Sequence, residues 1–215
     1  PDNADAYLAR GEVEYYLDRV VQAEKSYREA LRRSRNSFEA TLGLGRAVYS
    51  QALKDPQRAE EAVQTLRKAT EMRAGSEEAW RLLGELAVSQ GNLPGASEAV
   101  NALLSLNRAL SGEGEKTVGK ILFLQGRYPE AREHLEKAVS SIKSVNEREL
   151  VENRYLLGTC CFFLKDFDNA REHLRQARRS AQQEIYPLVQ WGQFLTFDGL
   201  MLPNDPERER KLGNA

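Results

Sequence analysis

Cysteine is scarce in this 215-residue sequence, which has two, Cys160 and Cys161, side by side. Two adjacent cysteines exclude a disulfide framework, and no Cys-x2-Cys or His-x3-His spacing of a metal site occurs. No run approaches the roughly 18 apolar residues that a membrane-spanning helix needs, so we expect no membrane insertion. Excess charge is also missing: 31 Lys and Arg stand against 32 Asp and Glu, so we expect no nucleic-acid partner.

Side chains that could carry chemistry are few, and we interpret them as structural. His134 and His173 share one slot of a repeated pattern and are expected to be exposed surface histidines. The adjacent cysteines are expected to be small buried or half-buried residues, because no local base would activate a catalytic thiol. Residues 112–114 look like a phosphate loop but lack the Gly-Lys-Ser/Thr that follows one. We therefore predict no catalytic residue, no metal site, no cofactor and no enzymatic activity.

An internal repeat is the strongest signal in the sequence. The strings AREHLEKA (131–138) and AREHLRQA (170–177) are near copies, 39 residues apart. An alanine, an apolar residue four later and a small or apolar residue three after that share one helical face. This triad occurs five times, as Ala23, Tyr27, Ala30; Ala62, Leu66, Ala69; Ala96, Val100, Leu103; Ala131, Leu135, Ala138; and Ala170, Leu174, Ala177.

A second marker, a glycine inside a predicted helix, precedes each triad. Gly11, Gly84, Gly119 and Gly158 lie 12 residues before the first alanine, and Gly45 lies 17 before it. A glycine inside a helix costs about 1 kcal/mol relative to alanine, so its recurrence indicates a place where a second helix packs against the backbone. Each unit is therefore predicted to be a helix with the glycine, a short turn and a second helix with the triad.

This pattern resembles the tetratricopeptide repeat (TPR), whose signature is best matched at Trp80, Leu83, Gly84 and Ala96. The resemblance implies an all-α fold, a right-handed superhelical solenoid of antiparallel helix pairs whose first helices line a concave groove. We expect one array over 1–202, with repeats starting near residues 4, 38, 77, 112 and 151 and a half repeat or cap at 185–202. Residues 203–215 are expected to be a charged, flexible tail.

Two insertions interrupt the repeat period of about 34 residues. Five extra residues fall inside the second repeat, around 53–57, and others fall between the fourth and fifth repeats, around 140–149. The proline that usually ends the family's second helix is absent from all five repeats. The superhelical pitch at the two insertions is therefore left open.

The predicted last helix carries more apolar surface than one packing face needs. Two interpretations stay open: a cap folded onto the fifth repeat, or a surface that packs on a continuation of the chain, on a partner or on a second copy. The predicted assembly surface consists of Trp191, Phe194, Phe197 and Met201.

In the family the concave groove binds partners, and the resemblance assigns five slots of each repeat to it. The usual clamp for a C-terminal carboxylate is not present in its usual place, because Leu8 and Glu12 stand there. Aromatic residues beside charges of both signs suit recognition of a peptide or helix, although some rings could instead pack between repeats. The predicted partner-binding residues are Glu12, Tyr15, Tyr16, Arg46, Tyr49, Arg81, Glu85, Lys116, Lys120, Phe123, Tyr155 and Phe162.

The function predicted from this resemblance is a non-enzymatic scaffold that binds a peptide or helix of another protein. Two alternatives stay open: a component of a bacterial envelope or polysaccharide-export assembly, and a regulatory segment of a larger enzyme. Because the chain begins at Pro1 without a methionine, we expect a fragment of a longer protein. Its location is unknown: the cytoplasm is favoured, and the periplasm stays open because the native N-terminus is missing.

Overall fold

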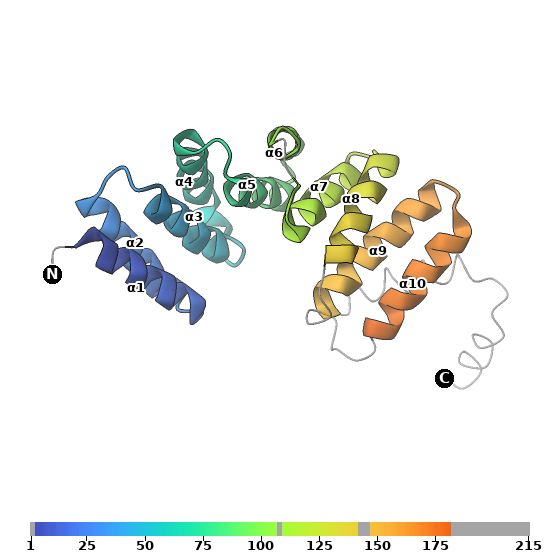
Figure 1. Cartoon of the computed structure of the whole chain (residues 1–215), viewed down its shortest axis with the longest axis horizontal. Helices are drawn as coiled ribbons and strands as arrows, with labels where there is room; N and C mark the ends of the chain where they lie inside the picture. Colours follow the sequence, from blue (N-terminus) through green and yellow to red (C-terminus); the bar gives the residue numbers. More distant parts are fainter. Residues whose placement is uncertain (1–2, 107–108, 142–146, 182–215) are drawn as a thin grey trace. The chain divides into compact units, whose positions relative to one another are not determined.

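The computed structural model of the protein describes residues 3–106, 109–141 and 147–181. These residues form ten α-helices and one short 3-10 helix, with no strand among them, which confirms the all-α prediction. The chain divides into two compact units, Pro1–Ile121 and Leu122–Ala215. The helices (Figure 1) are α1 (Ala4–Tyr16), α2 (Val20–Arg33), α3 (Phe38–Ala52), η1 (Pro56–Arg58), α4 (Ala59–Met72), α5 (Glu77–Ser89), α6 (Leu93–Leu104), α7 (Gly112–Leu124), α8 (Tyr128–Ser141), α9 (Glu147–Phe163) and α10 (Phe167–Ala181).

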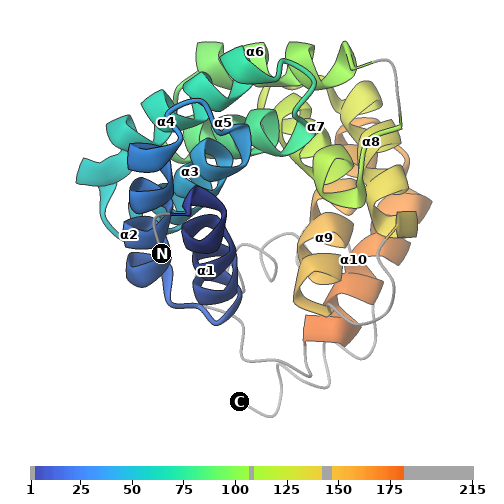
Figure 2. The ribbon, with the colours of Figure 1, turned by 60° about the vertical axis from the view of Figure 1, so that its left-hand side comes forward.

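In the first unit the helices pack in sequential pairs, and each pair also packs on the next. The first helices of the pairs, α1, α3 and α5, lie beside one another in one row, and the second helices, α2, α4 and α6, form a second row that covers one face of the first (Figure 2). In the second unit, α9 packs on both α8 and α10. Helix α9 begins at Glu147, four residues before the expected repeat start at 151, so part of the second insertion adds about one helical turn.

The repeated triads form the core of the helix pairs. All fifteen residues of the five triads are at most 4% exposed. In the first unit, the triad residues Ala23, Tyr27 and Ala62 share one cluster with Leu44 and Val48 of α3. Spacing alone predicts that each triad lies on one helical face, and burial of the triads confirms that this face is the packing face.

The glycines of the first helices lie where a side chain of a second helix presses on the backbone. A Cβ on Gly11 would lie 2.7 Å from the ring of Tyr27, and one on Gly45 would lie 2.7 Å from Leu66. Gly43, which is not part of the repeated pattern, also lies against Tyr27, and a Cβ there would lie 2.4 Å from its ring. A Cβ on Gly158 would lie 2.8 Å from Leu174. Real Cβ contacts essentially never fall below 3.0 Å, so these positions need glycine. The packing interpretation is thereby confirmed for Gly11, Gly45 and Gly158, and Gly84 is also closely packed, because a Cβ there would lie 3.0 Å from Ile121.

The turn between the two helices of a repeat contains one residue with a positive φ angle in four of the repeats. Gly91 and Gly126 have φ angles of 67° and 74°, while Asp18 and Lys165 have 56° and 64°. Glycine adopts this left-handed conformation freely, whereas it costs a lysine about 1 kcal/mol. The second repeat instead has the longer connection through η1.

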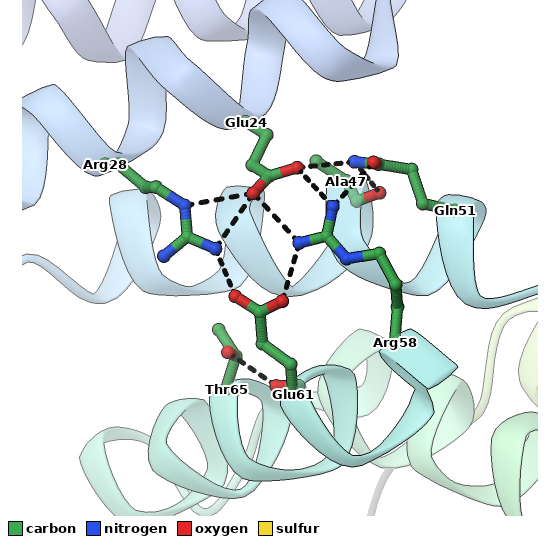
Figure 3. Close-up of polar contacts among 7 residues, drawn as sticks. All are labelled: Glu24, Arg28, Ala47, Gln51, Arg58, Glu61 and Thr65. Carbon is green, nitrogen blue, oxygen red and sulfur yellow. Dashed lines mark hydrogen bonds and ion pairs between the residues drawn. The ribbon is translucent and has the colours of Figure 1, made fainter. Parts of the chain in front are cut away.

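The insertion in the second repeat folds around η1, and Arg58 of η1 ties three helices of the first unit together. Arg58 donates hydrogen bonds of 2.9 Å to each carboxylate oxygen of Glu24 on α2, and another to Glu61 on α4. Arg28 donates to the same two carboxylates, and Gln51 of α3 donates to Glu24 at 2.7 Å (Figure 3). Burial opposes ionisation of Glu24, but these hydrogen bonds outweigh it and lower its pKa to about 2.

The prediction of exposed histidines is wrong: His134 and His173 are half-buried. Each stands one residue before a buried triad leucine, Leu135 or Leu174, so packing of the helices also covers part of the imidazole ring. The Nδ1 atom of His173 is buried without a hydrogen-bond partner, and burial lowers the pKa of this imidazole. Both cysteines are buried and free, as predicted.

Candidate functional site

The predicted binding residues of the first unit lie on consecutive first helices and contact one another across repeats. Arg46 on α3 donates two hydrogen bonds to Glu12 on α1, of 2.6 and 2.7 Å. Its Nε lies 3.6 Å from a carboxylate oxygen of Glu78 on α5. We call this surface of α1, α3, α5 and the N-terminal part of α7 the first-helix face; it includes Glu12, Tyr15, Arg46, Tyr49, Arg81, Glu85 and Lys116.

Glu85 is the centre of a second group of contacts on the first-helix face. It accepts hydrogen bonds from Tyr49 at 2.6 Å, from Arg81 at 2.8 Å and from Thr117 at 3.0 Å. The three donors belong to α3, α5 and α7, so three successive repeats meet at one carboxylate. This shared acceptor fixes the positions of the donor side chains relative to one another.

Two tyrosine hydroxyls are fixed as hydrogen-bond donors to the carboxylates of this face. Burial, and then the negative charge of Glu85, raises the pKa of Tyr49. Burial, and then the hydrogen bond of 2.9 Å that Tyr27 donates to Glu12, raises the pKa of Tyr27. Neither hydroxyl ionises near neutral pH, so the pattern of donors and acceptors stays constant.

The remaining predicted residues of the first unit, Tyr15, Tyr16 and Lys120, differ in their exposure and in their contacts with the first-helix face. The hydroxyls of Tyr15 and Ser50 share a hydrogen bond of 3.1 Å, and the guanidinium group of Arg46 lies 5.1 Å from the centre of the Tyr15 ring. Tyr16 is 89% exposed at the end of α1. Lys120 is half-buried on α7. The structure therefore brings Tyr15 into the contacts of the first-helix face and leaves Tyr16 in solvent.

In the second unit, the predicted Phe123 and Phe162 belong to a cluster of aromatic rings. Phe123 packs edge-on against Tyr128, with ring centres 5.7 Å apart, and Tyr128 stacks on Phe163 at 4.4 Å. Phe162 packs edge-on against Phe163 at 5.7 Å. Tyr155 is half-buried on α9. The alternative that some groove aromatics pack between helices of the array therefore applies to these rings.

The predicted cap at 185–202 and the tail at 203–215 lie outside the described residues, as does the predicted assembly surface of Trp191, Phe194, Phe197 and Met201.

A pocket of about 510 Å³ opens on the first-helix face at the N-terminal ends of α3, α5 and α7. Phe38 and Leu42, from the first turns of α3, supply its apolar lining. Arg81 supplies a guanidinium group with a side chain only 19% exposed, held by Glu85 at 2.8 Å. The other lining residues belong to the connection before α5 and to the starts of α5 and α7: Arg73, Gly75, Ser76, Glu77, Glu78, Ser111 and Glu113.

A carboxylate from the neighbouring repeat binds the residue just before α7. Glu77 accepts hydrogen bonds from the backbone N–H of Ser111 at 2.8 Å and from its hydroxyl at 2.5 Å. A Cβ on Gly114 would lie 2.4 Å from the same Glu77 oxygen, so a larger residue there would displace the Glu77 carboxylate from this position. Residues 112–114 are therefore explained by packing between repeats.

The sequence predicts Arg81 as a site residue but not the pocket around it. A recurring pattern could have located the pocket: Ser-x-Glu begins at Ser37, Ser76 and Ser111, at the start of α3, α5 and α7. Ser37 and Ser76 cap their helices by accepting a hydrogen bond from the backbone N–H three residues later. The glutamate that follows each serine is thus placed at the same end of its helix, where the pocket lies.

Among the described residues, no three His, Cys, Asp or Glu side chains are arranged to hold a metal ion. No helix of this part of the chain has the length and apolar character needed to cross a bilayer.

Three family profiles with the description tetratricopeptide repeat match residues 8–76, 53–109 and 115–183. A search of curated proteins finds no match to the chain. Solved structures do match: the APC/C hetero-tetramer Cut9–Hcn1 has a TM-score of 0.71 and 18% identity, over 94% of this chain and 37% of that one. The chain thus spans little more than a third of that relative.

Two other solved structures match over most of both chains. PilF of Pseudomonas aeruginosa has a TM-score of 0.64 and 16% identity, over 99% of this chain and 97% of that one. YrrB, described as a TPR protein with an unusual peptide-binding site, has a TM-score of 0.62 and 17% identity, over 83% of this chain and 87% of that one. At such identities the likeness shows the fold alone. The three profiles, which together cover residues 8–109 and 115–183, show that the chain belongs to the tetratricopeptide repeat family.

Proposed function

We propose that the protein is a non-enzymatic scaffold whose first-helix face binds a peptide or helix of a partner protein. The observation that carries this proposal is the pocket of about 510 Å³, which combines an apolar wall with charged groups of both signs. Binding sites typically use apolar lining for contact area and a few fixed polar groups for orientation. TPR proteins in general are scaffolds for protein–protein interaction, and one structural relative carries a peptide-binding site in its description.

The rigidity of the first-helix face supports the same proposal. Arg46, Tyr49 and Arg81 are each held by a carboxylate of this face, at 2.6 to 2.8 Å. A surface whose side chains are already ordered loses less conformational entropy when a ligand binds. The face is therefore prepared for a ligand without rearrangement.

Gly75 offers a way to test the pocket without disturbing the fold. It lines the pocket, and a Cβ at this position would meet nothing within 4 Å. A large side chain here would fill the pocket from its rim, whereas alanine would add a single methyl group. Gly75→Trp is the blocking variant and Gly75→Ala is its matched control.

The experiment selects peptides from a random phage-displayed library on the wild-type protein and measures their affinities by fluorescence anisotropy. We expect Gly75→Trp to weaken the selected peptides by at least about tenfold, and Gly75→Ala to leave their affinity unchanged. Thermal melts followed by circular dichroism check that both variants fold. The proposal is wrong if no peptide is selected, or if the selected peptides bind equally to Gly75→Trp.

A further inference from the structure

The pocket on the first-helix face carries more negative than positive side chains. Its lining includes the carboxylates of Glu77, Glu78 and Glu113 and two guanidinium groups, those of Arg73 and Arg81. Of the carboxylates, Glu113 is paired with Lys116 at 3.0 Å. Both guanidinium groups already have carboxylate partners outside the lining. Their charges are therefore largely neutralised before any ligand arrives.

The partners of the two arginines are close. Arg81 donates to Glu85 at 2.8 Å, and the side chain of Arg81 is only 19% exposed. Arg73 pairs with Glu39 at 3.0 Å. An incoming anion would have to compete with Glu39 for Arg73 and with Glu85 for Arg81, because each guanidinium group already binds one of these carboxylates. Binding of an anionic group is thus disfavoured.

Glu78 is the carboxylate best placed to meet a ligand. Its side chain is 37% exposed. Its carboxylate forms an ion pair with Arg46, in which the Nε atom lies 3.6 Å from the carboxylate oxygen, beyond hydrogen-bond distance. The same guanidinium group donates its shorter bonds, of 2.6 and 2.7 Å, to Glu12. Glu78 therefore retains acceptor capacity on the pocket side of the face.

The start of α7 argues against an anionic ligand in a second way. The N-terminus of a helix attracts negative charge, and such a site beside the pocket would normally favour a phosphate or a carboxylate. Here Glu77 already accepts the hydrogen bonds of Ser111, from both its backbone N–H and its hydroxyl. The protein supplies its own anion at this position.

The apolar wall of the pocket suits the stem of a long basic side chain. Phe38 and Leu42 can cover methylene groups while a charged head stays near the carboxylates. The ring of Phe38 already holds a cation in this structure, because the guanidinium carbon of Arg73 lies 3.7 Å from its centre. This contact shows that the wall is compatible with a guanidinium group.

We infer that the pocket is the binding site of an arginine or lysine side chain from the partner segment. The stem of that side chain packs against Phe38 and Leu42, and its cationic head binds Glu78. The inference rests on the proposed function, since it names the chemistry of the residue that the first-helix face anchors. A partner with a basic residue at the anchor position is selected over one with an acidic or apolar residue there.

The test uses the phage-selected peptides and two variants of Glu78. Glu78→Lys reverses the charge, and Glu78→Gln removes it with little change of shape. Glu133→Lys is the matched control, because Glu133 is an exposed residue of α8 and gives the same change in net charge. Each peptide is also made with its basic residues replaced, one at a time, by glutamine.

We expect the peptides to share a basic position, and glutamine there to weaken binding about tenfold. Glu78→Lys should weaken binding by at least as much, Glu78→Gln by a smaller factor, and Glu133→Lys not at all. Combining Glu78→Gln with the peptide substitution should add little further loss, because both changes remove one interaction.

Two other outcomes separate this inference from the proposed function. If the selected peptides are blocked by Gly75→Trp but need no basic residue, or bind Glu78→Lys as well as the wild type, the basic anchor is wrong and the binding face stands. If no peptide is selected, or Gly75→Trp has no effect on binding, the proposed function fails and the basic anchor fails with it.

Discussion

The two units of the molecule treat their buried polar side chains differently. In the first unit most such groups are paired across repeats: Glu24 is bound by two arginines and a glutamine, and Glu85 by three donors. Arg46 Nε, which is buried without a hydrogen bond, is the exception among the described residues of this unit. In the second unit, both amide atoms of the fully buried Asn153 have no hydrogen-bond partner among the residues that the structure describes. Buried nitrogens of Arg154, Arg171 and His173 are also without one.

The contrast follows from which slots of the repeat carry polar residues. Equivalent slots of neighbouring repeats lie side by side, so two complementary charges about one period apart can pair, as Arg46 does with Glu12 at 2.6 Å. Asn153 instead follows the expected repeat start at 151 by two residues, the slot that Ala40 and Ala79 fill in the first unit. Asn153 places a larger, polar side chain where those two repeats bury a methyl group, and its amide finds no partner among the described residues. The second unit should therefore have room for stabilisation that the first unit lacks.

The largest expected loss comes from Tyr27 in the first unit. Tyr27→Ala removes a fully buried ring that lies against Gly11 and Gly43, and should cost about 3–5 kcal/mol of the free energy of unfolding. Tyr27→Phe keeps the ring and loses only the bond to Glu12, for about 1 kcal/mol. Urea unfolding followed by circular dichroism measures both. Equal losses for the two variants would contradict the packing argument.

A smaller loss is expected from Arg58. Arg58→Ala removes a donor shared by Glu24 and Glu61 and leaves the buried carboxylate of Glu24 and the half-buried one of Glu61 with Arg28 alone among the arginines, so it should cost about 1–3 kcal/mol. Lys54→Ala, at an exposed position of the same connection, is the control and should change stability by less than about 0.5 kcal/mol. A similar small change for Arg58→Ala would mean that the network contributes nothing to the first unit.

The sign reverses in the second unit at Asn153. Asn153→Ala removes two buried unpaired polar atoms and should stabilise the protein by about 1 kcal/mol, after the loss of some packing. Asn101→Ala is the control, because Asn101 is exposed on α6. Hydrogen exchange of α8 and α9 amides locates the effect. Destabilisation by Asn153→Ala would show that the amide has partners in solution and would remove the difference between the units.

A smaller stabilisation is expected at Lys165, whose φ angle is 64°. Lys165→Gly places the residue found at Gly91 and Gly126 in the equivalent turn and should gain about 0.5–1 kcal/mol. Lys137→Gly, in the interior of α8, should lose a similar amount, because there glycine only adds flexibility to the unfolded chain. Thermal unfolding of the two variants should therefore shift in opposite directions. Shifts of the same sign would contradict the assignment.

The core of this fold could be predicted from the sequence because it depends on spacing within one helix. The triads and the glycines that they press on follow from a fixed repeat, and the structure buries both. The pairing of Arg46 with Glu12 and the pocket around Arg81 depend on how neighbouring repeats stack, which spacing within a repeat does not fix. The prediction that His173 is exposed is wrong for the same reason: helix packing covers part of its ring, because the residue stands beside the core leucine Leu174.

The two units should also lose stability in different ranges of pH. For Glu24 the pKa is about 2 in the folded protein and 4.5 ordinarily, so its contribution is complete above pH 4.5 and is lost as the pH falls toward 2. For His173 burial lowers the folded pKa below 6.5, so the unfolded chain takes up the proton first. Stability from the second unit is therefore complete above pH 6.5 and declines as the pH falls below that value.

This last difference is the smallest, because His173 is only half-buried and Glu136 and Glu172 partly offset the effects of Arg132 and Arg154 on its pKa. Thermal melts between about pH 2 and pH 8 test it in the wild type, Glu24→Gln and His173→Gln. We expect His173→Gln to flatten the profile just below pH 6.5 only, and Glu24→Gln to flatten it below pH 4.5 only. If either variant flattened both ranges, the two groups would be coupled and the units would not titrate independently.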